Sequence, residues 1–267
     1  MERNRLQRIF RAAWPRVLAI VLLVAIWQLL VVLGVTSDGG YGEPLPGPGD
    51  TLGEIGYLIH VNVLIPALLQ TLERAAVGYL MAMAIGTAIG LAVVRIPVLR
   101  AGVGSLLAGL QSLPSVVWVP IGVLFLGDFA VFFVVIMGAF PSIAMGLMSA
   151  YDNIPPLTLS LARSMGARGV PFYRHFILSA TLPGYVAGMK QAWAFSWRSL
   201  MAAELIIGSA ASAGLGQILD DGRFLGDLPE VFAAMLTILV VGIAVNDVIF
   251  APLERVLLRR RGLVPAT

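Results

Sequence analysis

The chain has 267 residues, of which 58% are hydrophobic and 12% are charged, and its formal net charge at pH 7 is +3. A soluble domain averages about 45–50% apolar and about 25% charged residues, because its surface must be solvated by water. The composition therefore excludes a soluble enzyme, a disordered segment and a nucleic-acid-binding protein, and the lack of cysteine excludes disulfides and thiolate metal sites. Long uncharged runs, rather than the short alternating segments of a β-barrel, predict an all-α polytopic membrane protein.

Six transmembrane helices are predicted from the runs of mostly uncharged residues, since the hydrocarbon core of a bilayer requires about 20 apolar residues in a helix. The runs cover residues 17–37, 75–94, 101–127, 129–151, about 183–210 and about 231–252. The first run is longer than the about 7–15 apolar residues of a signal peptide, and no small-residue cleavage site follows it. We therefore expect a retained helix, with a cleaved leader as the alternative.

Basic and acidic segments alternate along the chain, and cytoplasmic loops of membrane proteins carry an excess of Lys and Arg. The segments expected in the cytoplasm contain Arg3, Arg5, Arg8, Arg11, Arg16, Arg95, Arg100, Arg163, Arg168, Arg174, Arg255, Arg259, Arg260 and Arg261. The segments 37–67 and 211–229 are acidic by contrast. This alternation predicts that both termini are cytoplasmic, which agrees with an even number of helices.

The spans divide the chain into four expected regions. A cytoplasmic N-terminal segment (1–16) precedes the first helix and its outer loop (17–66), and this loop contains a candidate interfacial helix from Thr51 to Leu64. A five-helix core (67–252) includes a cytoplasmic loop (151–182), and a cytoplasmic tail (253–267) ends the chain.

Small residues recur every four positions in two of the predicted helices, a pattern that lets helices approach closely in lipid. The second helix carries Gly78, Ala82, Gly86 and Gly90, and the fifth carries Gly184, Gly188 and Ala192. We interpret both faces as helix-packing surfaces that contain no information about a substrate.

The third predicted helix contains Pro114 and Pro120 beside Gln111, Ser112 and Ser115. A proline leaves a carbonyl without its helical partner, and membrane proteins tolerate this where a cavity or a neighbour satisfies it. The sequence predicts a kinked, hydroxyl-lined helix that could form part of a pore. The alternative is a structural helix whose serines bond their own backbone.

Lys190, Arg198 and Glu204 interrupt the fifth predicted helix, and Asp247 lies near the end of the last one. Charges inside a membrane require partners or water. Arg198 and Glu204 are six residues apart and so point about 120° away from each other on a helix. We expect one of them to face a translocation path and the other a neighbouring helix, with packing or snorkelling as the alternative.

Several kinds of catalytic site have no counterpart in the sequence. Lys190 is the only lysine and no glycine precedes it, so the chain contains no phosphate-binding loop for nucleotide hydrolysis. His60 and His175 fall on opposite sides of the predicted membrane and cannot share a metal ion. We therefore expect neither an enzyme nor a cofactor or metal site in this chain.

The predicted cytoplasmic loop resembles that of bacterial ABC importer permeases, whose pattern is Glu-Ala-Ala, three residues, Gly, nine residues and Ile-x-Leu-Pro. Ala162 and Gly166 match this pattern, whereas Ser160 stands at the acidic position. Further segments resemble the nitrate/sulfonate/taurine/bicarbonate branch of the family, namely 45–48, 71–74, 113–120, 182–183, 197–204 and 214–216.

This resemblance implies a six-helix permease with the MetI-like fold in the bacterial inner membrane, paired with a second copy or a paralogue. A dimer of cytoplasmic ATPase subunits would bind ATP and Mg, and an external binding protein or lipoprotein would deliver a small oxyanion, sulfonate or related organic anion. Residues expected to contact the ATPase are Ser160, Ala162, Arg163, Gly166, Ala167 and Arg168. Residues expected along the translocation path are Gln111, Ser112, Pro114, Ser115, Trp197, Arg198 and Glu204. A secondary transporter or channel without an ATPase is the alternative.

Overall fold

The computed structural model describes residues 2–34, 44–166, 177–207 and 214–260, and in these ranges the chain is helical and contains no β-strand. The chain divides into two compact units. The first comprises Met1–Ile65 with Ile218–Leu236, and the second comprises Pro66–Gln217 with Thr237–Thr267.

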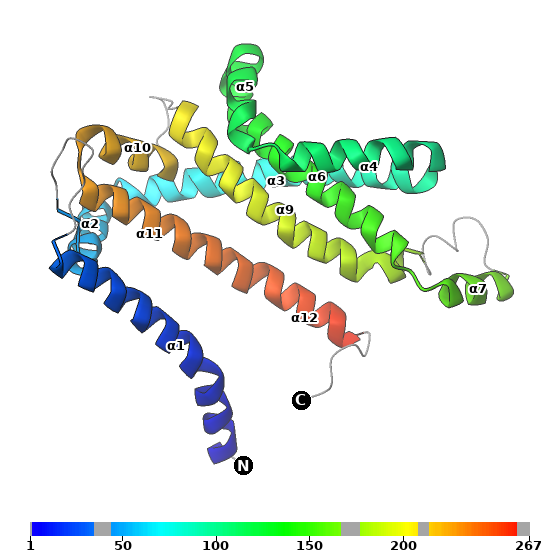
Figure 1. Ribbon diagram of the computed structural model, residues 1–267, viewed down its shortest axis with the longest axis horizontal. Coiled ribbons are helices and arrows are strands. Elements are labelled where there is room, and N and C mark those ends of the chain that lie inside the picture. The colour runs from blue at the N-terminus through cyan, green and yellow to red at the C-terminus, as the bar shows by residue number, and fades with distance from the viewer. Residues whose placement is uncertain (1, 35–43, 167–176, 208–213, 261–267) are drawn as a thin grey trace. The chain divides into compact units, whose positions relative to one another are not determined.

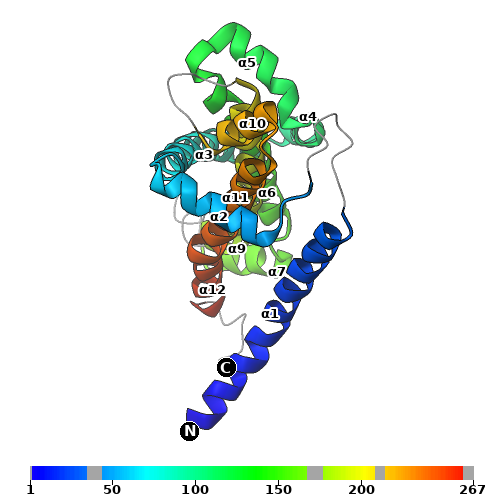
Figure 2. The ribbon, with the colours of Figure 1, turned by 90° about the vertical axis from the view of Figure 1, so that its left-hand side faces the viewer.

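The first unit contains α1 (Glu2–Val32) and α2 (Pro48–His60), together with parts of α10 (Leu215–Leu225) and α11 (Leu228–Val245). The indole N–H of Trp27 donates to the Pro46 carbonyl at 3.0 Å, and its ring stacks on Phe232 with centroids 5.7 Å apart. The helix expected near residues 51–64 is confirmed as α2, the short helix visible in Figure 2.

The second unit contains the remaining helices (Figure 1). They are α3 (Leu64–Arg95), α4 (Pro97–Ser112), α5 (Trp118–Leu126), α6 (Ala130–Asp152), α7 (Pro156–Ser164), α9 (Leu178–Ile207) and α12 (Ala251–Arg260). The turns η1 (Ser115–Val117) and η2 (Gly127–Phe129) flank α5, and a π-helical turn η4 (Asn246–Phe250) joins α11 to α12.

Helices α6 and α9 pack directly against each other along their length, as Figure 1 shows. A Cβ atom on Gly146 would lie 2.7 Å from the Cα of Gly188, so larger residues would separate the two helices. Helix α3 approaches α6 similarly, because a Cβ on Gly86 would lie 2.7 Å from the Phe140 carbonyl oxygen. The two small-residue faces predicted from the sequence are therefore confirmed as packing surfaces.

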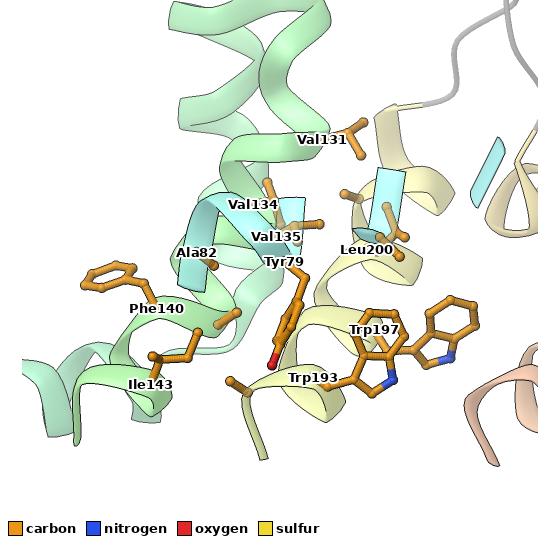
Figure 3. Packing of buried hydrophobic residues seen from close by; sticks show 14 of the residues in the cluster. Tyr79, Ala82, Val131, Val134, Val135, Phe140, Ile143, Trp193, Trp197 and Leu200 are labelled. Carbon is orange, nitrogen blue, oxygen red and sulfur yellow. The ribbon is translucent and has the colours of Figure 1, made fainter. Parts of the chain in front are cut away.

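Aromatic side chains of α3 and α9 meet in the core of the second unit, where Figure 3 labels Tyr79, Trp193 and Trp197, and Phe250 of the π-helical turn contacts them. The Tyr79 hydroxyl donates to the Met189 carbonyl at 2.9 Å, and its ring meets Trp193 edge-on with centroids 5.4 Å apart. Trp193 in turn stacks on Trp197 at 6.1 Å and contacts Phe250. These contacts combine burial with favourable ring geometry, so they fix α9 against its neighbours.

Three helical stretches in the described ranges are long and apolar enough to cross a membrane: Leu64–Arg95, Ser115–Asp152 and Leu228–Leu257. A shorter apolar helix covers Val17–Val32. Helix α9 occupies the position of the fifth predicted span and includes its three charged residues. The total of six membrane spans stays a prediction.

The expectation of one kinked helix over residues 101–127 was wrong. Helix α4 ends at Ser112, Leu113 is extended with φ −70° and ψ 130°, and α5 runs in a different direction from α4 (Figure 1). The cause is Pro114, because the ring of a proline disfavours helical geometry at the residue before it. Pro120 lies in the first turn of α5, where its missing N–H costs little.

Candidate functional site

Five of the seven predicted path residues line one open cavity of about 300 Å³ in the second unit. The cavity lies between the end of α4, the turn η1, α6 and α9, and we name it the Arg198 cavity. Its lining residues are Leu110, Gln111, Ser112, Leu113, Pro114, Ser115, Val116, Gly138, Phe195, Arg198 and Ser199. The break in the helix at Leu113 therefore contributes to the cavity wall.

Arg198 is exposed and brings a positive charge to the wall of this cavity. Its Nε donates to the Ala194 carbonyl at 3.2 Å, and its guanidinium carbon lies 4.7 Å from the centroid of the Phe195 ring. No carboxylate in the described part of the chain forms an ion pair with it. The charge is thus held in place by its own helix and is not neutralised by an acidic side chain of those residues.

Two of the predicted serines, Ser112 and Ser115, lie in the wall of this cavity. The Ser112 hydroxyl donates to the Gly109 carbonyl at 2.7 Å. Ser112 thus follows the alternative prediction, in which the serines of this segment bond their own backbone. Ser115 begins the turn η1 and also lines the cavity. Ser112 therefore satisfies its own helix end and shapes the wall.

A second open cavity, of about 550 Å³, lies along the contact between α6 and α9, and we name it the Gly146 cavity. Its lining residues are Gln111, Ser142, Met145, Gly146, Ser149, Ala150, Asn153, Ala180, Gly184, Ala187, Gly188 and Gln191. Gln111 lines both cavities, and its amide nitrogen donates to the Ser142 hydroxyl at 2.7 Å. Small and polar side chains thus line most of the Gly146 cavity, whereas Leu110, Leu113, Val116 and Phe195 add apolar groups to the Arg198 cavity, and the two cavities share Gln111.

Glu204 lies apart from both cavities and is 3% exposed. Its carboxylate accepts hydrogen bonds from Arg74 Nη1 at 2.9 Å, from the Thr71 hydroxyl at 2.9 Å and from the Gly216 N–H at 3.1 Å. The Leu215 N–H donates to the Thr71 hydroxyl at 2.9 Å. We name these residues the Glu204 cluster, and it holds α3, α9 and the start of α10 together.

The glycine before α10 is required by this cluster. A Cβ on Gly214 would lie 2.5 Å from the carboxylate carbon of Glu204, so a side chain there would displace the carboxylate. Arg74 supplies the charge that compensates for removing Glu204 from water. The geometry gives Glu204 a structural partner set, and its role along a translocation path stays a prediction.

Trp197 likewise does not line either cavity. It is buried in the aromatic core against Trp193, and a Cβ on Gly242 would lie 3.2 Å from its Nε1. Its assignment to the path also stays a prediction.

Sequence reasoning did not single out the polar residues of the Gly146 cavity on α6. Ser142, Gly146, Ser149 and Asn153 all line this cavity and follow a spacing of four, three and four residues. This spacing places them on one face of a helix. A search for small and polar helical stripes, rather than for charges and prolines, would have found them.

The predicted ATPase-contacting segment begins with the short helix α7. Ser160 is exposed on this helix, and its carbonyl accepts a hydrogen bond from the Ser164 hydroxyl at 3.0 Å. Gly166 follows the helix with φ +75°, and no atom of the described residues outside its chain neighbours lies within 4 Å of its Cβ position. Ala162 and Arg163 belong to α7, whereas Ala167 and Arg168 lie outside the described residues.

Comparison with known proteins places this architecture in a family. Residues 82–259 match the family described as binding-protein-dependent transport system inner membrane component. The chain is 25% identical to the nitrate import permease protein NrtB of Leptolyngbya laminosa, over 90% of this chain and 86% of that protein. It is 26% identical to the putative aliphatic sulfonates transport permease protein SsuC of Bacillus subtilis, over 94% and 89%.

A probable ABC transporter permease protein of Brucella melitensis is 23% identical over 84% of this chain and 88% of its own length. Among solved structures, a chain of the MetNI methionine ABC transporter in inward-facing conformations has the same fold. The TM-score is 0.62 at 19% identity, covering 74% of this chain and 97% of that chain. The family match covers more than half of the present chain. The chain therefore belongs to the binding-protein-dependent inner membrane components and is a permease subunit of an ABC importer.

Proposed function

We propose that this permease carries a small oxyanion, a sulfonate or a related organic anion through the Arg198 cavity. The position of Arg198 supports this proposal most directly, because its guanidinium lines an open cavity and forms no ion pair with a carboxylate of the described residues. A cationic side chain within a membrane span is costly unless water, a partner or a ligand compensates for it. A passing anion supplies that compensation transiently.

The chemistry of the guanidinium agrees with this substrate class. A guanidinium is planar and matches the geometry of oxyanions, and it binds them through two parallel hydrogen bonds. The names of two relatives mention nitrate and aliphatic sulfonates, which are both anions of this kind.

The second part of the proposal concerns the partners. Both cavities open at the surface of this chain, and polar cavity walls cannot face lipid without cost. We propose that a second permease copy or a paralogue covers them, that two ATPase subunits binding ATP and Mg dock on the segment that begins with α7, and that an external binding protein delivers the solute.

The orientation completes the proposal, with both termini in the cytoplasm of a bacterial cell. Because the chain has no cysteine, each introduced cysteine is a unique label. Cysteines replacing Asp50 and Asp221 should react with an impermeant reagent in intact cells, and one replacing Arg168 only after permeabilisation. Reaction at Arg168 in intact cells would reverse the orientation.

Transport in proteoliposomes tests the function. The permease is purified with the ATPase subunits that accompany it, and uptake of radiolabelled nitrate, taurine and an alkanesulfonate is measured with its binding protein, with and without ATP. We expect ATP-dependent uptake of at least one anion and none of choline, the cationic control. Anion flux through the permease alone, with no ATPase accompanying it, would favour a secondary transporter or channel.

A further inference from the structure

We propose that the hydrogen bond between Gln111 and Ser142 is an internal gate dividing the solute path into two compartments. Gln111 lines both the Arg198 cavity and the Gly146 cavity, and Ser142 lines the Gly146 cavity. The inference rests on the proposed function, since it assigns the same cavities to the path.

The first support is the position of Gln111. It lines both cavities, so its side chain lies where they adjoin. Its amide nitrogen reaches across from α4 to the Ser142 hydroxyl on α6 at 2.7 Å, a short distance for a neutral hydrogen bond. The bond therefore joins two helices at the boundary between the cavities.

The two partners differ in how firmly they are held. Ser142 is 2% exposed and follows the fully buried Pro141 in the middle of α6. Gln111 is half-buried in the last turn of α4, one residue before that helix ends. The last carbonyls of a helix have no partner within it, and beyond Ser112 the chain is extended at Leu113. Gln111 is thus the less buried partner and lies at a helix end, so the proposed gate assigns the movement to it.

An oxyanion has the chemistry to open this gate. The amide nitrogen of Gln111 and the hydroxyl of Ser142 are both hydrogen-bond donors, and an oxyanion accepts from both. Binding of the anion replaces the bond between the two side chains with two bonds to the solute. A neutral hydrogen bond contributes little to stability, so its exchange leaves the helices folded.

The test measures how fast the transported anion leaks through the whole complex in proteoliposomes without ATP. Gln111→Ala removes the side chain at the boundary, and we expect downhill flux of the transported anion without ATP to rise at least tenfold above that of the native complex. Ser105→Ala is the matched control, because Ser105 lies exposed on the same helix α4 and lines neither cavity, and it should not leak. Thermal unfolding is followed by tryptophan fluorescence. A midpoint equal to that of the native complex would show that both variants are folded.

Thiol modification gives a second readout that does not depend on transport. A cysteine replaces Ser149 in the Gly146 cavity, and the complex is placed in oriented vesicles. A membrane-impermeant anionic methanethiosulfonate is then added on the side of the membrane to which the Arg198 cavity opens. We expect its modification rate to rise at least tenfold when Gln111→Ala is also present.

The outcomes separate the gate from the proposed function. If the native complex shows no ATP-driven anion uptake, the proposed function fails, while the thiol measurement still reports whether Gln111 separates the cavities. If the native complex transports, but Gln111→Ala neither leaks nor changes the modification of the Ser149 cysteine, the gate is overturned.

Discussion

Two charged residues on helix α9, Arg198 and Glu204, occupy opposite environments in the same unit. Glu204 is buried, accepts hydrogen bonds from three residues and pairs with Arg74. Arg198 is exposed at the wall of a cavity, and no carboxylate in the described ranges pairs with it. Their sequence context is the same apolar helix, so the difference comes entirely from the neighbours that the fold supplies.

This difference supports a structural role for Glu204 and, under the proposed function, a transport role for Arg198. Removing a carboxylate from water is costly, and the cost is offset only where the geometry satisfies its oxygens and its charge. The Glu204 cluster meets both conditions with protein groups alone. Arg198 has no such carboxylate partner in the described ranges, and the proposed function assigns its charge to a solute. A mutation should therefore affect folding at one residue and transport at the other.

Breaking the Glu204 cluster should have the largest effect. Arg74→Ala leaves the buried carboxylate without its counter-charge, and we expect a loss of about 3–5 kcal/mol in the free energy of unfolding. Thermal unfolding in detergent, followed by tryptophan fluorescence, measures this loss. The double variant Arg74→Met/Glu204→Leu should be less destabilised than Arg74→Ala, because it removes both charges. If Arg74→Ala unfolds at the same temperature as the native protein, the Glu204 cluster does not stabilise the fold.

Replacing Arg198 should change transport with little change in stability. Arg198→Gln keeps a polar side chain without its charge, and an exposed substitution usually alters stability by less than about 0.5 kcal/mol. We expect ATP-driven anion uptake to fall at least tenfold, and Arg198→Lys to retain part of it. Normal transport by Arg198→Gln would assign Arg198 a structural role, like that of Glu204.

The helical architecture was largely predictable from the sequence, because long uncharged runs mark the helices and small residues repeat with helical spacing. The faces containing Gly86 and Gly188 pack as expected, whereas the break at Leu113 was mistaken for a kink. The partners of Glu204 were not predictable, since Thr71 and Arg74 lie more than 100 residues away and their contact depends on how α3 and α9 are oriented. Helical periodicity assigns a face to a residue, but it does not identify the neighbour of that face.

A third prediction extends the comparison to the segment after α7, where a glycine has either a local or a partner-dependent role. Gly166 has φ +75°, a conformation that Asn adopts more readily than other side chains, and no described residue beyond its chain neighbours lies within 4 Å of its Cβ position. If an ATPase subunit approaches this position closely, both Gly166→Leu and Gly166→Asn should reduce ATPase attachment and abolish solute-stimulated hydrolysis. Ser160→Glu should be neutral or strengthen attachment.

Co-purification of the ATPase and its hydrolysis rate, with and without solute, measure this effect. If Gly166→Asn behaves like the native protein while Gly166→Leu does not, the glycine serves only to end α7. A Gly166→Leu complex that keeps its ATPase and responds to solute would place the coupling contact elsewhere.

The smallest effect is expected at Glu54 in the first unit, a carboxylate whose neighbour is another acid rather than a cation. Burial raises the pKa of Glu54 above its usual value of 4.5, and the nearby Asp227 carboxylate raises it further. The folded unit therefore binds this proton more tightly than the unfolded chain does. The resulting stabilisation is fully present below the unfolded pKa and is lost as the pH rises through the folded pKa.

Glu54→Gln removes this titration and the repulsion from Asp227. The difference in unfolding temperature between the native protein and Glu54→Gln, measured as the pH is lowered from 7 to 4, reports the titration of Glu54 together with its coupling to Asp227 and Glu230. We expect the variant to be slightly more stable at pH 7 and to lose that advantage at pH 4, where Glu54 becomes protonated. A difference that stays constant over this range would show that Glu54 ionises at the same pH in the folded and unfolded chains. If the stability of Glu54→Gln relative to the native protein instead increases as the pH falls, Glu54 has a cationic partner, as Glu204 has in Arg74.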